Sequence, residues 1–251
     1  MRKADNEQIV GGINTVDTII DLGKDSSKKL FVLKSKTSLR IKSLIEKAES
    51  KNIGIFFKDL NFFKTNCKNI NHQGIAILYK SRKEEDDSFL DGLLERKNLL
   101  LLILDHLTDP HNVGACIRSA AAANVDAIIV PKNRSCHLTP VVRKISSGGS
   151  ELIPFVIVKN LVRALKKISS SGVDILGADL SGEESYSEIN FGLRVAFVIG
   201  SEDKGLKRLT SENCDKLIKI KMPGKIQSLN ASVSAGILLF EFLNYQKSKM
   251  E

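Results

Sequence analysis

Short apolar runs alternate with amphipathic stretches over residues 99–251. The apolar runs are typical of buried strands and lie at residues 99–104, 127–130, 155–158, 174–177, 194–199 and 217–220. Helical patterns separate or follow them near residues 113–123, 139–146, 160–170, 205–213 and 231–246. This alternation predicts an α/β fold with a mostly parallel sheet and helices on both faces.

The pattern before residue 99 predicts a smaller unit. Strands are predicted at residues 29–33, 53–57 and 75–79, and a helix at 38–51. Residues 81–88 form a polar run of mixed charge, Ser-Arg-Lys-Glu-Glu-Asp-Asp-Ser, which is typical of a linker. We therefore predict a small α/β domain over residues 1–80, a linker over 81–98 and a second domain over 99–251.

Length and composition are those of a globular protein. The chain has 251 residues, of which 42% are hydrophobic and 27% charged, so collagen, coiled coil and general disorder are excluded. The longest apolar run, residues 99–104, is far shorter than the ~20 residues of a membrane span, and no apolar signal segment follows Met1. We expect a cytoplasmic protein with no membrane partner.

Positive charge is concentrated in the first third. The net charge is +9, and residues 1–80 hold 15 basic and 8 acidic side chains, a net charge of +7. A compact basic domain is the usual partner of a nucleic-acid phosphate backbone. A solvated lysine-rich surface without a partner explains the charge alone equally well.

Cysteine and histidine spacing argues against a metal site. Cys67, Cys116, Cys136 and Cys214 form no CxxC pair, and the four histidines have no metal-ligand spacing such as HExxH. We expect buried thiols, no disulfide framework and no protein-bound metal.

Two familiar nucleotide motifs also fail. Gly200-Ser-Glu-Asp-Lys-Gly205 follows a predicted strand, but Leu206 and Lys207 stand where a P-loop needs Lys and then Ser or Thr. No GxGxxG follows a predicted strand, so a dinucleotide Rossmann site is not supported.

The loops after residues 104, 199 and 220 lie where ligands bind in open parallel sheets. In the first loop a helix is predicted to begin at about Asn112, with Gly114 and Arg118 on one face, open to an anion. Taken singly, these residues are better explained by structural roles, as a capping Asn, a packing Gly and a surface Arg, than by a function.

The second and third loops carry further polar groups. Glu202 lies between Gly200 and Gly205, and glycine allows sharp turns and close approach to a ligand. In the third, Pro223 and Gly224 lead to a predicted helix N-cap at Ser228 or Asn230.

Together these segments resemble the SpoU (TrmH) family of RNA ribose 2′-O-methyltransferases, which belong to the SPOUT class. The matching motifs are Asn112-x-Gly114-x-x-x-Arg118, Gly200-Ser-Glu202-x-x-Gly205, Ile220-x-Met222-Pro-Gly and Ser228-Leu-Asn230-x-Ser232. The segments Gly12-Ile13 and His72-Gln73-Gly74-Ile75 resemble the ribosomal-protein-like RNA-binding domain of the bacterial 23S rRNA guanosine 2′-O-methyltransferases.

The resemblance implies S-adenosylmethionine as cofactor, a C-terminal trefoil knot and a homodimer. The cofactor-binding positions match Gly200, Ile220, Met222 and Leu229, and the RNA-binding positions match Gly12, His72, Gln73 and Arg118. Apolar surface for a homodimer is expected from Ile237, Leu238 and Phe242 on the last helix, although these residues fit a core equally well.

The implied reaction is methyl transfer to a ribose 2′-hydroxyl, in a guanosine of 23S rRNA. Arg118 matches the family arginine for which a general-base role has been proposed, but a guanidinium loses its proton only above about pH 12, so we favour an electrostatic clamp. Asn112, Glu202 and Asn230 are expected to orient Arg118 and the ribose.

Two alternatives stay open at this point. One is a tRNA ribose 2′-O-methyltransferase, which the Gly-Ile and His-Gln-Gly-Ile segments disfavour because tRNA enzymes commonly carry basic helical extensions instead. The other is a catalytically silent RNA-binding protein of the same fold, which the basic first domain favours.

Overall fold

The computed structural model describes residues 7–22, 28–35, 38–68, 71–201, 203–226 and 228–249. The chain divides into two compact units, Met1–Lys83 and Glu84–Glu251. Each unit has its own sheet, and each is described here by itself.

The first unit is a four-stranded mixed sheet between helices. Its elements are β1 (Glu7–Gly11), α1 (Ile13–Asp21), β2 (Lys29–Leu33), α2 (Leu39–Ser50), β3 (Gly54–Lys58), α3 (Leu60–Asn66) and β4 (Ile75–Lys80). The strand order is β1-β4-β2-β3; β2 and β3 are parallel, and the other two pairs are antiparallel. Helices α1 and α2 pack on one face of the sheet and α3 on the other.

The sequence pattern predicted four of these seven elements. The α2 helix begins after Ser38, whose hydroxyl accepts a hydrogen bond from the Ile41 amide at 3.3 Å. The sequence pattern did not predict β1, α1 or α3. The residues of β1 are all half-buried, so no alternation of buried and exposed positions marks the strand.

The second unit contains a seven-stranded sheet in the order β7-β6-β5-β10-β8-β11-β9. Its strands are β5 (Leu99–Leu104), β6 (Ala127–Pro131), β7 (Phe155–Val158), β8 (Asp174–Ala178), β9 (Glu184–Ser185), β10 (Arg194–Ile199) and β11 (Lys216–Lys219). Every strand pair is parallel, which confirms the predicted fold class. The trefoil knot stays a prediction.

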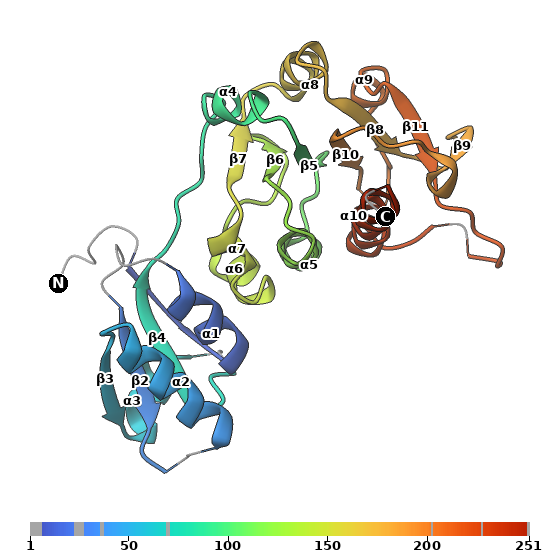
Figure 1. Ribbon diagram of the computed structural model, residues 1–251. Helices are drawn as coiled ribbons and strands as arrows, with labels where there is room; N and C mark the ends of the chain where they lie inside the picture. The colour runs from blue at the N-terminus through green and yellow to red at the C-terminus, as the bar shows by residue number, and fades with distance from the viewer. Residues whose placement is uncertain are drawn as a thin grey trace. The chain divides into compact units, whose positions relative to one another are not determined.

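Helices cover both faces of this sheet (Figure 1). One layer contains α4 (Phe89–Leu94), α8 (Leu161–Ser170) and α9 (Arg208–Ser211); the other contains α5 (Pro110–Ala122), α6 (Pro140–Ile145), α7 (Gly149–Leu152) and α10 (Ala231–Ser248). The short 3₁₀ helix η1 (Tyr186–Glu188) follows β9. Among the described residues, no helix is long and apolar enough to cross a membrane.

Strand β5 shows why its sequence is a continuous apolar run. Leu99, Leu101 and Ile103 pack in the core on the α4 and α8 side. The residues between and after them, Leu100, Leu102 and Leu104, pack under α5 and α10. All six residues are buried. A central strand of a parallel sheet has no solvent face, so alternation of polar and apolar residues disappears.

The segment predicted as a linker, residues 81–98, is largely part of the second unit. The Glu85 amide donates to the Phe155 carbonyl at 2.9 Å, and the Ile157 amide donates to the Glu85 carbonyl at 2.9 Å. Leu90 and Leu93 of α4 are buried in the core. Backbone pairing and two apolar anchors hold this polar-looking segment against the sheet.

Helix α5 begins earlier than predicted. Asp109 is the N-cap, and its carboxylate accepts a hydrogen bond from the His111 amide at 3.0 Å, while Pro110 takes the first helical position. Asp is a strong N-cap and proline suits the first turn, so this pair takes precedence over Asn112. Asn112 therefore lies within the first turn rather than at the cap.

Gly114 is a packing residue rather than part of an open anion-binding face. A Cβ atom at this position would lie 2.6 Å from the Ile145 Cβ and 3.1 Å from the Val142 carbonyl oxygen. The backbone of α5 thus approaches α6 directly at this glycine. The surface next to Arg118 predicted to be uncrowded is filled by α6.

We predict that Gly114→Ala destabilises the protein by about 1–3 kcal/mol, because the added methyl group must displace packed backbone and side chain. Gly92→Ala in α4 is the matched control. Its Cβ would meet nothing within 4 Å, so the better helix former should raise stability by about 0.5–1 kcal/mol. Urea unfolding followed by circular dichroism measures both changes; equal stability of Gly114→Ala and the wild type would contradict the packing role.

Candidate functional site

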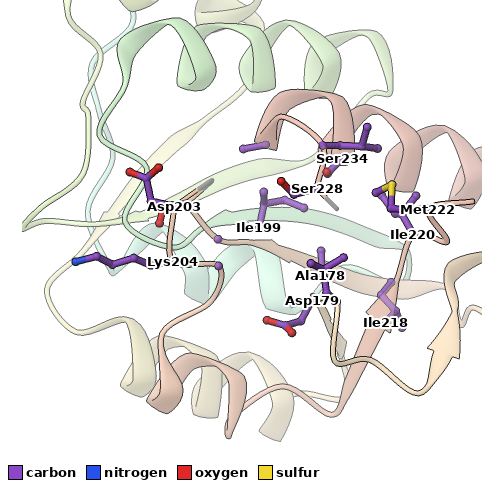
Figure 2. Close-up of a pocket in the computed structure, with 16 residues that line it drawn as sticks. Ala178, Asp179, Ile199, Asp203, Lys204, Ile218, Ile220, Met222, Ser228 and Ser234 are labelled. Carbon is purple, nitrogen blue, oxygen red and sulfur yellow. The ribbon is translucent and has the colours of Figure 1, made fainter. Parts of the chain in front are cut away.

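A cavity of about 410 Å³ opens at the carboxyl-terminal edge of the seven-stranded sheet. Its walls come from the loops after β8, β10 and β11 and from the first turn of α10. Figure 2 shows Asp203 and Lys204 at one end of the cavity and Met222 at the other. The loops meet because parallel strands place their carboxyl ends at the same edge.

All four residues expected to bind the cofactor line this one cavity. They are Gly200, Ile220, Met222 and Leu229. Apolar side chains of Ile199 and Ile218 add to the lining. The structure thus brings together residues of the second and third loops, which α9 and β11 separate in the sequence.

At Gly200, the two ends of the second loop approach each other most closely. The Gly205 amide donates to the Ser201 carbonyl at 2.8 Å, and the Ser201 amide donates back to the Gly205 carbonyl at 3.2 Å. A Cβ atom on Gly200 would lie 2.2 Å from the carbonyl carbon and oxygen of Gly205. Gly205 itself has φ +60, which favours glycine. The loop can close because Gly200 has no Cβ atom to collide with the Gly205 carbonyl, and because Gly205 adopts a positive φ.

A buried carboxylate that the sequence analysis missed holds this loop to the sheet. Asp105 directly follows β5 and is 1% exposed. Its carboxylate accepts a hydrogen bond from the Lys207 amide at 2.8 Å and contacts the His106 ring, while its amide donates to the Ile199 carbonyl at 2.8 Å. An acidic residue directly after an all-apolar strand was the available signal.

Asn112 and Asn230 are in direct contact. Asn230 caps α10, and its side-chain oxygen accepts hydrogen bonds from the Ser232 amide at 2.9 Å and from the Ser232 hydroxyl at 2.6 Å. Its Nδ2 donates to the Asn112 Oδ1 at 2.8 Å. The capping interaction fixes the Asn230 amide, so the predicted cap connects the third loop to the first.

Arg118 forms no hydrogen bond with this pair in the described structure. Arg118 is exposed on α5 and does not line the cavity. Glu202 lies outside the described residues. Of the four side chains expected to act in catalysis, the described structure therefore brings together only Asn112 and Asn230.

Charged groups at the cavity are a second feature that the sequence analysis missed. Asp179, Asp203 and Lys204 line the cavity together with its apolar walls. The Asp179 carboxylate accepts a hydrogen bond from the Ser181 amide at 2.9 Å. Asp179 directly follows β8, so its position at a strand end could have marked it.

Burial, aided by Asp215, raises the pKa of the Cys214 thiol to about 12, so the thiol stays protonated at neutral pH. Within the described ranges, no group of three or more His, Cys, Asp and Glu side chains is placed to hold a metal ion.

The RNA-binding positions expected in the first unit also meet in space. Gly12 has φ +104 and precedes α1, and the Ile13 amide donates to the Gln73 Oε1 at 3.0 Å. The His72 Nδ1 accepts from the Gly74 amide at 3.0 Å, and the His72 ring stacks on Phe63. Residues around 12 and 72 thus form one local structure.

Two family models match the chain. The SpoU rRNA methylase family matches residues 99–240, and the RNA 2′-O ribose methyltransferase substrate-binding family matches residues 9–84. The matched ranges correspond to the two units of the structure.

Individual relatives match both units. The 23S rRNA (guanosine-2′-O-)-methyltransferase RlmB of Coxiella burnetii is 40% identical over 92% of each chain, and that of Neisseria meningitidis is 37% identical over 94% of each. The structure of the SpoU methyltransferase AviRb of Streptomyces viridochromogenes, solved with AdoMet, superposes with a TM-score of 0.75. It is 21% identical, and the match covers 97% of this chain and 92% of that one.

Proposed function

Because the chain belongs to the SpoU rRNA methylase family, we propose that it transfers a methyl group from S-adenosylmethionine to a ribose 2′-hydroxyl of RNA. The single observation that carries the proposal is the cavity at the sheet edge, which Gly200, Ile220, Met222 and Leu229 line together. The target we propose is a guanosine of 23S rRNA, since the relatives named for that activity match more than nine-tenths of the chain.

The cavity has properties that suit this cofactor. Its volume of about 410 Å³ falls in the range of sites for ligands of this size. The Gly200 backbone packs directly against the Gly205 carbonyl, and this contact sets the shape of the loop that lines one side of the cavity. Apolar walls suit an aromatic ring, and Asp203 and Lys204 suit the charged amino-acid end of such a molecule. When bound, the cofactor supplies a methyl group on a positively charged sulfur.

The side chains proposed for catalysis position the ribose and stabilise negative charge on its oxygen. Arg118 carries two parallel donors on a planar fork, which suits a phosphate or an alkoxide. The Asn112–Asn230 pair holds the first and third loops together and can orient the ribose by hydrogen bonds. We assign Glu202 to the same orienting role on the strength of its motif position.

RNA recognition is proposed to rest with the first unit. Gly12, His72 and Gln73 lie together there, and residues 1–80 hold a net charge of +7. Phosphate contacts by basic side chains supply much of RNA affinity. The match of residues 9–84 to the RNA 2′-O ribose methyltransferase substrate-binding family supports this assignment.

We also propose a homodimer formed through the α10 face. Leu238 and Phe242, which the sequence analysis offered as dimer surface, lie in the core instead. Val233 and Phe240 are exposed on α10, at 47% and 46%. Helix α5, which carries Arg118, packs beside α10 (Figure 1), so we propose that a second copy on this face meets Arg118.

The glycine at residue 200 tests the cofactor site. Gly200→Ala should weaken binding of S-adenosylhomocysteine at least tenfold in titration calorimetry, because the new methyl group collides with the Gly205 carbonyl. Ser201→Ala in the same loop should bind almost as the wild type does. Wild-type affinity in a Gly200→Ala protein that still melts cooperatively would place the cofactor elsewhere.

Arg118 tests the reaction. Arg118→Ala should lower methyl transfer to 23S rRNA by about 10²-fold or more while cofactor binding stays intact, since a stabilising donor is lost. Arg118→Lys should not restore activity, because a point charge lacks the planar fork. Arg163→Ala removes an exposed arginine from α8, on the opposite layer, and should leave activity unchanged. Normal transfer by Arg118→Ala refutes the assignment.

A charged substitution on the exposed face of α10 tests the proposed homodimer. Phe240→Glu should convert a dimer to a monomer in sedimentation velocity and reduce methyl transfer, because a buried carboxylate opposes association. Leu209→Glu, at a 52% exposed leucine of α9 in the other helix layer, should stay dimeric. A wild-type protein that sediments as a monomer would rule out this part of the proposal.

A further inference from the structure

Strand β3 carries two exposed phenylalanines at the edge of the four-stranded sheet. In the described sheet β3 pairs only with β2 (Figure 1). Phe56 is 41% exposed and Phe57 is 53% exposed. Large apolar side chains on an open edge strand favour aggregation, so their presence there calls for a binding partner.

The two rings lie on opposite faces, because neighbouring side chains of a strand alternate. Phe56 lies on the α3 face, where its ring centroid is 6.0 Å from that of Phe31. Lys58 shares this face, and Phe57 does not. Phe57 is therefore a natural control for any role of Phe56.

Phe56 is the outer end of a continuous run of rings. The Phe31 centroid is 4.7 Å from that of Phe62, which is 5.7 Å from that of Phe63. Phe63 in turn lies 4.5 Å from the His72 ring. His72 is among the residues proposed above to contact RNA, so the run joins that position to the β3 edge.

The Lys58 ammonium group lies close to two rings of this run, Phe56 and Phe62. The Lys58 Nζ lies 6.0 Å from the Phe56 centroid and 5.5 Å from the Phe62 centroid. Side-chain rings beside an ammonium group combine the two contacts that single-stranded nucleic acid offers, a base to stack on and a phosphate to neutralise.

The surrounding charge is strongly positive. Over residues 28–35 and 53–68, Asp59 is the sole acidic residue, and its carboxylate caps α3 by accepting from the Phe62 amide at 2.9 Å. The Lys28 ammonium donates to the Leu22 carbonyl. The other five lysines of these segments form no ion pair with any described residue: Lys29, Lys34, Lys58, Lys64 and Lys68. Their charge is available to an anionic partner.

The opposite side of the same unit is different. Lys47 of α2 forms ion pairs with Asp17 and Asp21, and Lys51 pairs with Asp21 at 2.7 Å. The hydrogen bond from Lys47 lowers the pKa of Asp21, so the Asp21 carboxylate stays ionised. The two lysines and two aspartates of this cluster therefore neutralise one another. The charge excess of the unit is thus concentrated on the β3 and α3 side.

We propose that Phe56, Lys58 and Phe62, here named the β3 aromatic surface, stack unpaired nucleotides of the RNA substrate. The inference rests on the proposed function, which supplies RNA as the partner, and it adds which surface of the first unit meets it and in what form. Exposed rings suit unstacked bases, whereas a paired helix offers none. A single strand is therefore the occupant that this chemistry favours.

Fluorescence tests the stacking directly. The chain has no tryptophan, so Phe56→Trp introduces a single indole into the full-length protein. Addition of a single-stranded oligouridylate should quench this emission strongly, and a duplex of the same length should quench it much less. Phe57→Trp, on the opposite face of the strand, should show little quenching with either RNA. Equal quenching of the two proteins, or none in Phe56→Trp at RNA concentrations that saturate binding, would overturn the proposal.

Affinity measurements give a second readout that does not depend on the new indole. Phe56→Leu keeps an apolar side chain but removes the ring, and it should weaken oligouridylate binding by about tenfold. Lys58→Gln should reduce the slope of log affinity against log salt by about 0.7, the value for one single-strand phosphate contact. Phe57→Leu should leave both quantities unchanged. Unaltered affinity and salt slope in the first two variants would contradict the surface.

The outcome separates this inference from the proposed function. Cofactor binding and methyl transfer by the wild-type protein test the function alone, and they involve no change on β3. If the wild-type enzyme methylates 23S rRNA while the β3 variants bind RNA normally, the inference fails and the function stands. If transfer is absent while Phe56→Trp is quenched, the function fails and the surface binds RNA for another purpose.

Discussion

The second unit depends on the parallel pairing of β5 with β10, two strands far apart in the sequence. Residues 99–104 lie directly opposite residues 194–199, and β8 pairs with the other side of β10. Because all these strands run in one direction, the loops that follow them emerge at one edge. Every later feature of the cavity follows from this register, since a shift of one residue would exchange the two faces of each strand.

Backbone contacts, more than side chains, then shape the loops at that edge. Gly200 lies against the Gly205 carbonyl at a distance that no Cβ atom permits. The Asp105 carboxylate holds the Lys207 amide from the end of the neighbouring strand. A buried carboxylate is costly unless hydrogen bonds compensate it, so the same contact that satisfies Asp105 also fixes the loop. The cavity is therefore preorganised by the sheet that supports it.

The sequence predicted elements with strong local signals and missed those without them. All-apolar β5 and capped α2 were found, whereas β1, with evenly half-buried residues, gave no period to detect. The motif glycines predicted the cavity at Gly200, but Gly114 looked equally free and in fact packs on Ile145. Glycine in a sequence marks a close approach without saying what approaches. Only the fold shows whether the neighbour is another helix, as at Gly114, or the backbone of the same loop, as at Gly200.

The exposed position of Arg118 limits what one chain can do alone. Its helix packs beside α10, while the cavity lies at the strand ends, and Arg118 is absent from the cavity lining. A guanidinium that acts on the reacting ribose must come within hydrogen-bond reach of it. Within one chain, Asn112 and Asn230 meet the geometric requirement for acting together and Arg118 does not. In the proposed homodimer, a twofold axis along the α5 and α10 face would bring each Arg118 towards the other copy, so that two chains would complete the active site together.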